Sequence, residues 1–403
     1  MSHSFTPEKM PRRRFGRTEL AMPVFTCGGM RFQHSWKDDD PATIPDENQR
    51  NLEETVRHAL SLGINHIETA RGYGTSEVQL GRFLREFPRD EMIIQTKVSP
   101  ECDAAKFRET FERSMACLRL DHVDLLSLHG INNHEILTHS LEPGGPLAVA
   151  REIQQEGRAK FIGFSTHASC DVITRAINTG EFDYVNLHWY WVNQSNSTAI
   201  EAAAAQDVGV FIISPNDKGG KLYAPPEKLR RLCEPLSPMA FNNLFCLANP
   251  SVHTLSVGAA RPSDFDEHIR SLSHLADTGA LVPAISDRLE EAMAAEFGQE
   301  WINQWQIGIP PWESCPDEIH VWEILRLFLF AKSLDMVDFA KMRYNLLGQA
   351  GHWFPGKNAA EFSDAKMLEA LRSSPLCERI PSVLREAHSL LFEKPIERLS
   401  QSE

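Results

Sequence analysis

The chain has 403 residues, of which 42% are hydrophobic and 24% charged, and its formal net charge at pH 7 is -14. This composition is that of a soluble globular protein with room for one domain of about 250 residues and a smaller one. The acidic excess argues against binding of nucleic acid, which requires clustered Lys and Arg.

The N-terminal residues include no apolar stretch of signal-peptide length, and no window approaches about 18 continuous apolar residues. We therefore expect a cytoplasmic protein that does not span a membrane. The eight cysteines include no Cys-x-x-Cys pair, so neither a disulfide framework nor a zinc site is expected.

The first predicted element is a hairpin with the basic residues 12–14 at its edge, an interaction arm being the alternative. Eight short segments rich in strand-forming residues then recur about every thirty residues, and amphipathic helical stretches fill the gaps. The predicted strands are 24–28, 66–70, 93–98, 123–129, 161–165, 184–189, 210–215 and 254–258.

Strands that alternate with helices indicate parallel pairing with right-handed crossovers, and eight such units close most naturally into a (β/α)₈ TIM barrel. An open, doubly wound sheet is the alternative. We assign residues 1–280 to the barrel domain and 281–403 to an all-helical C-terminal extension. Within the extension, apolar periodicity predicts helices at 287–297, 317–333, 336–347, 363–371 and 380–392.

Four titratable residues, Glu68, Tyr73, Lys97 and His129, lie at or just after the ends of three successive predicted strands. The C-terminal ends of barrel strands meet at one mouth, so we expect these side chains to converge. A lysine kept charged by a carboxylate would favour the phenolate and prepare the tyrosine for general-acid work on a carbonyl oxygen. The alternative is structural, with a turn aromatic, a strand-end lysine and a hydrogen-bonded core histidine.

These residues belong to segments that together resemble the aldo-keto reductases over about residues 11–275. The matching segments are 14–20, 27–30, 63–77, 162–165 and 257–262. The resemblance implies that Tyr73 donates a proton, that Lys97 and Glu68 adjust its acidity, and that His129 orients the carbonyl while nicotinamide delivers hydride.

The resemblance also implies an extended NADPH, with NADH as the alternative, held without a Rossmann domain, and no Gly-x-Gly-x-x-Gly follows a predicted strand. Ser165 and Asn186 would reach the carboxamide. A glycine turn before a helix N-terminus suits the adenosine phosphate, although a generic strand-to-helix turn explains it as well. The remaining cofactor residues implied are Gly29, Met30, Ser214, Pro215, Gly258 and Arg261.

The chain departs from the family pattern at four positions. Glu68 stands where Asp is usual, so we expect a displaced carboxylate and a slower reaction, since a misplacement of about 1 Å can cost about 10²-fold in rate. Asn186 shortens the usual Gln, and Ile213 stands where many members stack an aromatic ring. Asp264 lies where several members carry a basic residue, which weakens the case for NADPH.

The tail resembles the helical extension of the branch whose C-terminal domain is ferredoxin-like. Only Cys315 and Cys377 remain in the two cysteine segments, and a [4Fe–4S] cluster needs four thiolates. We therefore expect no iron–sulfur cluster. A metal shared by His129 and His188 would need a third ligand, so we interpret His188 as a polar wall residue.

The resulting prediction is an NAD(P)H-dependent reductase of a small aldehyde or ketone. A nicotinamide-binding sensor or scaffold that acts through its helical tail is the rival. Neither the substrate nor the oligomeric state follows from the residues.

Overall fold

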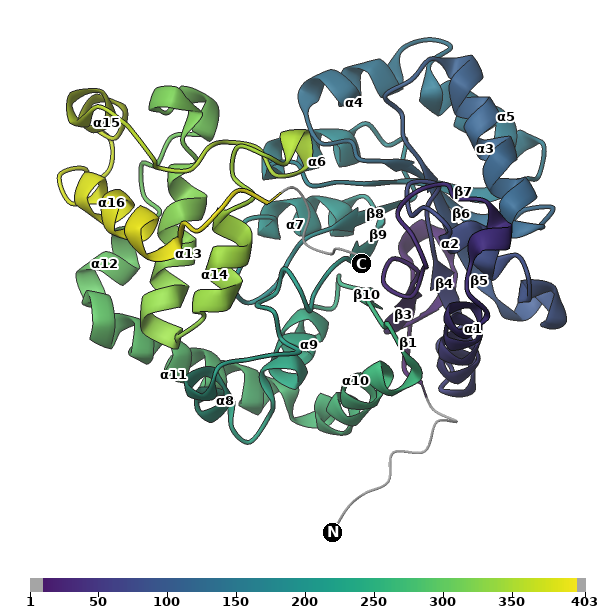
Figure 1. Ribbon diagram of the computed structural model, residues 1–403, viewed down its shortest axis with the longest axis horizontal. Coiled ribbons are helices and arrows are strands. Elements are labelled where there is room, and N and C mark those ends of the chain that lie inside the picture. Colours follow the sequence, from purple (N-terminus) through teal and green to yellow (C-terminus); the bar gives the residue numbers. More distant parts are fainter. Residues whose placement is uncertain (1–9, 397–403) are drawn as a thin grey trace. The chain divides into compact units, whose positions relative to one another are not determined.

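The computed structural model describes residues 10–396, shown as a ribbon in Figure 1. Eight parallel strands close a barrel in the order β10-β3-β4-β5-β6-β7-β8-β9. They are β3 (Phe25–Gly28), β4 (His66–Glu68), β5 (Ile93–Val98), β6 (Val123–His129), β7 (Ala159–Ser165), β8 (Tyr184–Leu187), β9 (Gly209–Ile212) and β10 (Thr254–Val257). Each overlaps a predicted segment, and the pairing of β10 with β3 closes the sheet. The predicted TIM barrel is confirmed.

Helices connect the strands, and each buries one apolar face; α1, for example, buries Leu52, Val56 and Ala59. The helices α3 and α5 pack on each other beside β5, β6 and β7 (Figure 1). The helices from α1 to α10 are α1 (Asp46–Ser61), α2 (Ser76–Leu80), α3 (Ala104–Leu118), α4 (His134–Leu141), α5 (Pro146–Gln155), α6 (Cys170–Asn178), α7 (Ser197–Ala205), α8 (Glu227–Cys233), α9 (Pro238–Ala248) and α10 (Asp266–Ser271).

The predicted N-terminal hairpin is present as β1 (Arg12–Arg14) paired antiparallel with β2 (Ala21–Pro23). Phe15, between these strands, is fully buried in a core cluster with Tyr184 and Phe211. A side chain on Gly209, at the start of β9, would lie 2.7 Å from the Phe15 ring. The hairpin therefore packs against the end of the barrel opposite to the predicted mouth, because Gly209 and Tyr184 begin their strands.

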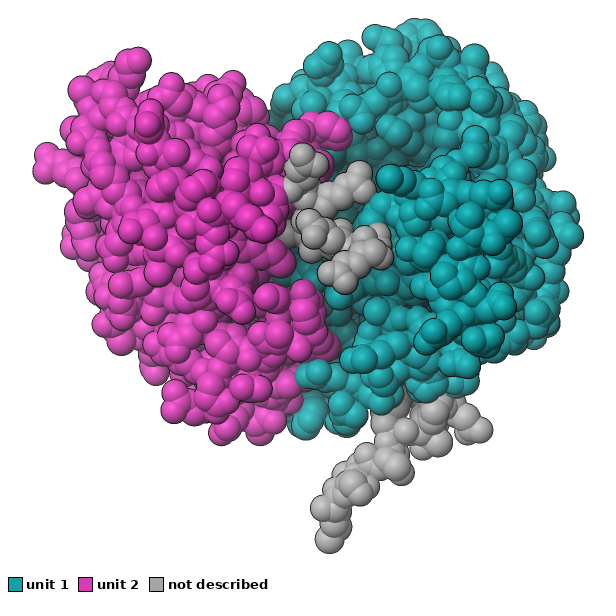
Figure 2. Space-filling view, viewed as in Figure 1, with its two compact units in different colours: residues 1–219, 242–278, 402–403 teal, residues 220–241, 279–401 magenta. Residues whose placement is uncertain are grey.

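The described residues divide into two compact units, 10–219 with 242–278 and 220–241 with 279–396, coloured separately in Figure 2. The second unit contains α8 and the C-terminal helices α11 (Thr278–Phe297), α12 (Gln299–Gln304), α13 (Val321–Leu334), α14 (Val337–Tyr344), α15 (Asp364–Ala370) and α16 (Ile380–Leu391). Every residue of α13 except Trp322 and Lys332 is buried, and α14 and α16 pack against this helix. The α13 helix is the centre of the unit.

Two details of the predicted tail were wrong. The first helix begins nine residues early, at Thr278, because Pro283 lies inside it rather than at a break. A separate helix, α12, follows Gly298, whose φ of 85° suits glycine and interrupts the helical path.

Several other predictions stay open. The division into two folding domains at residue 280 and the ferredoxin-like character of the tail stay predictions. Residues 1–9, in which we expect no signal peptide, lie outside the described range, as do 397–403 of the predicted extension. Among the described helices, none has the length and apolar character needed to cross a membrane.

Candidate active site

The four predicted catalytic side chains meet at the C-terminal ends of β4, β5 and β6. The Tyr73 hydroxyl lies 3.2 Å from Glu68 Oε1 and 3.1 Å from Lys97 Nζ. Lys97 Nζ also contacts Glu68 Oε1 and donates to the Thr69 carbonyl at 3.0 Å. The His129 ring stands edge-on to the Tyr73 ring, with centroids 5.7 Å apart. The structure thus brings together all four residues that the sequence predicted to converge.

Burial sets the charge state of this group. Glu68 and Lys97 are only 3% and 1% exposed, whereas Tyr73 and His129 are partly exposed. Loss of water lowers the pKa of Lys97, an effect that the adjacent carboxylate opposes. Burial, followed by repulsion from Lys97, lowers the pKa of His129 to about 3, so its imidazole is neutral at pH 7.

The pKa of Tyr73 is shifted in the direction opposite to the one that the sequence predicted. Burial raises the pKa of this phenol above its ordinary value, whereas the sequence led us to expect a lowering by the Lys97 ammonium. Desolvation of a phenolate outweighs a single neighbouring cation here. The phenol therefore keeps its proton at neutral pH.

Gly28 explains how the long side chain of Glu68 fits at this position. Gly28 is directly opposite Glu68 in the pairing of β3 with β4. A side chain at Gly28 would meet Glu68 Oε2 at 3.4 Å and Ser256 Oγ at 2.6 Å. The missing side chain leaves room for the glutamate, whose carboxylate still contacts both Lys97 and Tyr73.

A layer of buried polar side chains lies directly below the catalytic group, at the preceding inward-facing position of each strand. His66, Gln95 and Ser127 each precede a catalytic residue by two positions, so they share its face of the strand. Gln95 contacts His66 Nε2 at 3.1 Å and donates to Ser127 Oγ at 2.9 Å. Thr26 and Tyr184 extend the chain of contacts from His66 and Ser127. This network ties neighbouring strands together beneath the site.

Two predicted carboxamide ligands lie side by side at the next strand ends. Ser165 pairs in register with Asn186, and its hydroxyl accepts the Gly130 N–H at 3.2 Å. Asn186 is fully buried, yet neither its Nδ2 nor its Oδ1 has a hydrogen-bond partner. A buried amide without partners is costly, so this one is suited to a ligand with a matching donor and acceptor.

The segment after β9 carries Ser214 and Pro215. Ser214 has the left-handed φ of 54°, and its carbonyl accepts the Lys218 N–H at 3.1 Å. The Pro215 carbonyl accepts from Asn242 at 3.1 Å. Ile213 packs against the barrel core, and its carbonyl accepts the Tyr190 hydroxyl. These contacts fix the conformation of the segment, and the cofactor role of Ser214 and Pro215 stays a prediction.

The aromatic residues after β8 are packing residues. Trp189 stacks on Phe245 with centroids 4.7 Å apart and donates to Ser197 Oγ at 3.0 Å. His188 Nε2 lies 2.8 Å from His167 Nδ1, and Lys218 Nζ lies within 3.3 Å of both nitrogens. His188 is thus part of a basic wall, and residues 10–396 hold no group of three His, Cys, Asp or Glu able to bind a metal ion.

In the predicted phosphate loop after β10, an acidic residue of the loop itself contacts the groups that were expected to bind the phosphate. Arg261 is largely exposed and donates to Asp264 Oδ1 at 3.2 Å, while Asp264 Oδ2 accepts the Ala260 N–H at 2.8 Å. Gly258 packs on the Arg31 side chain. Both groups that would face a 2′-phosphate in this loop already contact a carboxylate.

The first-strand residues have different surroundings. The Gly29 N–H donates to the Glu68 carbonyl at 2.7 Å, and a side chain there would meet that carbonyl and Ser76 Oγ within 2.9 Å. Gly29 is therefore required by packing, whether or not a cofactor is bound. Met30 follows it and is partly exposed.

The sequence model described as Aldo/keto reductase family matches residues 25–232, more than half of the chain. The chain belongs to the aldo/keto reductase family. It is 25% identical to the L-galactose dehydrogenase of Arabidopsis thaliana over 56% of this chain and 79% of that protein. The identity to the NADH-specific methylglyoxal reductase of Escherichia coli is also 25%, over 44% of this chain and 60% of that protein.

Aldo-keto reductases are also found among the solved structures with a similar fold. The holo form of an aldo-keto reductase from Bacillus halodurans aligns with a TM-score of 0.57 at 20% identity, covering 69% of this chain and 96% of that one. This likeness concerns the fold alone. As a family member the chain is an NAD(P)H-dependent oxidoreductase acting on carbonyl and hydroxyl groups, as predicted.

The sequence does not show which groups the two arginines near the mouth contact. In the structure Arg71 pairs with Glu77 at 2.6 Å, and Arg31 pairs with Asp217 at 3.4 Å. The six-residue spacing of Arg71 and Glu77 on either side of the Tyr73 turn is the sequence signal for this ion pair. The geometry of the turn was needed to show that the two side chains meet.

Proposed function

We propose that this chain reduces a small aldehyde or ketone in the cytoplasm, with Tyr73 as the proton donor. The observation that carries the proposal is the contact of one tyrosine hydroxyl with both Glu68 and Lys97 beside a neutral histidine. A structural role for the set requires no such convergence. The location at the C-terminal face of a TIM barrel also suits catalysis.

Tyr73 is protonated before the reaction because burial raises its pKa. When negative charge develops on the carbonyl oxygen, that oxygen becomes a stronger base than phenolate and takes the proton. Lys97, 3.1 Å away, stabilises the phenolate that remains, and Glu68 keeps the lysine oriented.

His129 orients the substrate in this proposal. Its neutral imidazole can donate a hydrogen bond to the carbonyl oxygen without bringing a second positive charge next to Lys97. Its ring stands edge-on to the ring of Tyr73, the proposed proton donor. Trp36, also edge-on to Tyr73 with centroids 6.2 Å apart, would form an apolar wall.

The chain's residues fit a nicotinamide cofactor. The buried Asn186 amide offers one donor and one acceptor without partners, next to the Ser165 hydroxyl, and a carboxamide matches that pair. The bound dinucleotide would supply the hydride. Ser214, Pro215, Gly258, Arg261, Gly29 and Met30 are the further residues proposed to line its path.

We propose NADPH as the preferred nucleotide, with NADH also accepted. Arg261 supports NADPH as a cation near the proposed phosphate position. Asp264 opposes it, since this carboxylate contacts both Arg261 and the Ala260 N–H. An exposed ion pair of this kind is worth about 1 kcal/mol or less, so the preference should be small.

The test is the variant Tyr73→Phe, which keeps the ring and removes only the proton donor. Binding of each nucleotide is followed by tryptophan fluorescence and turnover by cofactor oxidation with a panel of aldehydes. The enzyme loses about 10²-fold or more in kcat with unchanged nucleotide affinity. A wild type that binds nucleotide without turning over any carbonyl would instead favour the sensor.

A further inference from the structure

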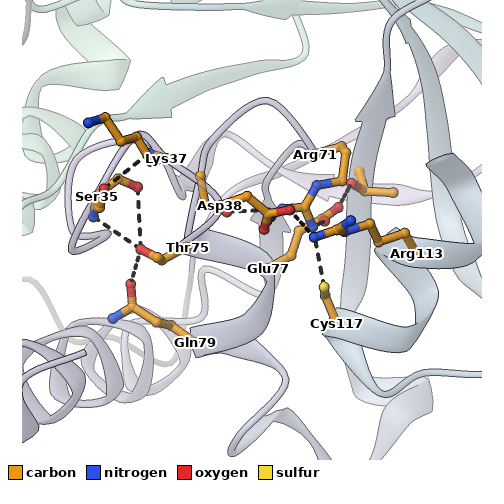
Figure 3. A network of polar contacts seen from close by, with 11 residues as sticks. Ser35, Lys37, Asp38, Arg71, Thr75, Glu77, Gln79, Arg113 and Cys117 are labelled. Carbon is orange, nitrogen blue, oxygen red and sulfur yellow. Dashed lines mark hydrogen bonds and ion pairs between the residues drawn. The ribbon is translucent and has the colours of Figure 1, made fainter. Parts of the chain in front are cut away.

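The turn that carries Tyr73 is held by the ion pair of the partly exposed Arg71 with the buried Glu77 and by the outer partners of this pair, which together we call the Arg71 clamp (Arg71, Glu77, Asp38 and Arg113; Figure 3). Arg71 donates to Glu77 Oε2 at 2.6 Å and to Asp38 Oδ1 at 2.7 Å. Arg113 contacts Asp38 from α3. One guanidinium thus joins the end of the Tyr73 turn to the segment after β3.

A second, uncharged set of contacts joins the same two segments. Thr75 Oγ1 accepts the N–H groups of His34 and Ser35, both at 3.1 Å, and the Thr75 N–H donates to the Ser35 carbonyl at 3.0 Å. Gln79 accepts from His34 at 2.9 Å and from Thr75 at 2.8 Å. Figure 3 shows this set beside the Arg71 clamp. The segment from residue 34 to 38 is therefore attached at both ends.

Trp36 and Tyr73 lie between these two attachments. Trp36 is in the middle of the attached segment, Tyr73 is in the middle of the turn, and their rings meet edge-on. Gly74, with φ of 51°, brings the two backbones into contact: a side chain there would lie 2.0 Å from the Ser35 carbonyl. The contacts leave little freedom for either ring.

The clamp also reaches the lysine of the catalytic group. The Arg71 N–H donates to the Lys97 carbonyl at 3.0 Å. Glu77 Oε1 accepts the hydroxyl of Thr96, the residue before Lys97, at 2.6 Å. Displacement of Arg71 or Glu77 would therefore move the Tyr73 turn relative to β5.

We propose that Arg71 is a positioning residue for the reduction, holding the Tyr73 hydroxyl on Lys97 through Glu77 and holding the Trp36 segment through Asp38. The inference rests on the proposed function for its kinetic consequences only. Arg71 itself touches no reacting atom among the contacts described here.

The chemistry of the pair explains why an arginine holds this place. Glu77 is fully buried, and burial alone raises its pKa, which Arg71 counters. A guanidinium presents several donors in a fixed plane, so one side chain can serve Glu77, Asp38 and the Gly74 carbonyl together. A lysine in its place would serve fewer of them.

The kinetic test separates the two halves of the clamp. Arg71→Met should lower kcat about 10²-fold, the size of effect expected for a misplacement near 1 Å, and Arg71→Lys should recover part of it. Asp38→Asn leaves the Glu77 contact intact, so it should raise KM for the carbonyl about tenfold with little change in kcat. The matched control is Arg108→Met, which removes another ion-paired arginine, on α3, facing Glu152 and Glu156.

A second measurement does not depend on turnover. In the protein without cofactor, hydrogen exchange should rise in peptides spanning 33–38 and 71–77 for Arg71→Met, in 33–38 only for Asp38→Asn, and in neither for Arg108→Met. If Arg71→Met does not fold, Arg71→Met with Glu77→Leu avoids a buried unpaired carboxylate and should show the same loss of kcat.

Two results would overturn the inference. One is a kcat for Arg71→Met within threefold of the wild type. The other is unchanged exchange at 71–77 in that variant. If the wild type reduces no carbonyl, the proposed function fails while the exchange pattern alone still decides whether Arg71 holds these segments.

Discussion

The carboxylate of the catalytic group in the barrel and one carboxylate of the helical unit are both buried against positive side chains, but the cations of these two sites differ. In the barrel, Glu68 contacts Lys97 beside the partly exposed Tyr73. In the helical unit, Glu323 pairs with Arg326 at 2.7 Å and with Arg343 at 3.5 Å, and all three are buried. The Arg343 guanidinium also lies 3.9 Å from the centre of the Phe354 ring.

The difference lies in which partner can change its charge. A lysine ammonium can lose its proton, and burial lowers the pKa of Lys97, whose Nζ lies next to the Tyr73 phenol. Burial opposes ionisation of Glu323, but the two arginines still lower its pKa to about 2. Arginine stays charged in proteins, so the helical pair is fixed. In the proposed function, the pair that takes part in proton transfer is therefore the one whose cation is a lysine beside a proton donor.

Lys97→Met should give the largest effect. It leaves Glu68 buried without its cation and removes the charge that stabilises the Tyr73 phenolate, so kcat should fall about 10³-fold. Steady-state turnover with one aldehyde measures this. Arg326→Met, assayed in parallel at a temperature where it stays folded, should keep kcat near the wild-type value; an equal loss would erase the distinction between the pairs.

Glu323→Gln should give the largest loss of stability. The variant leaves two buried guanidinium groups without their carboxylate, and breaking a buried pair costs about 3 kcal/mol or more. Denaturant unfolding followed by tryptophan fluorescence measures the free energy. The neighbouring exposed pair between Lys332 and Glu386, 3.3 Å apart, provides the control, since Glu386→Gln should cost less than about 1 kcal/mol. Similar losses for both variants would contradict this assignment.

The pH dependence of stability should separate into two windows. Burial lowers the pKa of His66 to about 3, below the ordinary 6.5, so the unfolded chain binds more protons between these values and stability falls as the pH drops below 6.5. Glu323, with its pKa lowered to about 2 from 4.5, loses its contribution only as the pH falls below 4.5.

His66→Gln tests the upper window. Between pH 7 and pH 5 the wild type should lose about 2 kcal/mol more stability than the variant, whose glutamine at position 66 cannot bind a proton, while the other buried histidines contribute equally to both proteins. Denaturant titrations at the two pH values give the difference. Equal losses would mean that His66 is protonated in the folded barrel.

Asn186→Leu should give the smallest effect. Its amide is buried without a partner, so the cofactor-free protein should lose no stability, while affinity for the nicotinamide nucleotide should fall about tenfold. Thermal unfolding and fluorescence titration measure the two quantities. Loss of stability with unchanged affinity would remove Asn186 from the cofactor site.

The sequence predicted much of the barrel because its signals are local. Strand-forming segments at regular intervals identified all eight barrel strands, and the ends of three of them placed Glu68, Lys97 and His129 at one mouth. The start of α11 was missed because a proline inside a helix looks like a helix boundary. The slower reaction expected from Glu68 stays a prediction, and the space that Gly28 leaves for this longer side chain depends on a neighbouring strand.

The sequence by itself determined the order of strands and helices, the family and the set of side chains that meet at the mouth. These follow from periodicity and from the rule that parallel strands end at one face. Only the tertiary structure decided in which direction the pKa of Tyr73 is shifted. It also decided that the exposed Arg261 pairs with Asp264 and that Arg71 pairs with Glu77 and Asp38. Burial and the choice of ion-pair partners depend on residues brought together by folding, which no local pattern records.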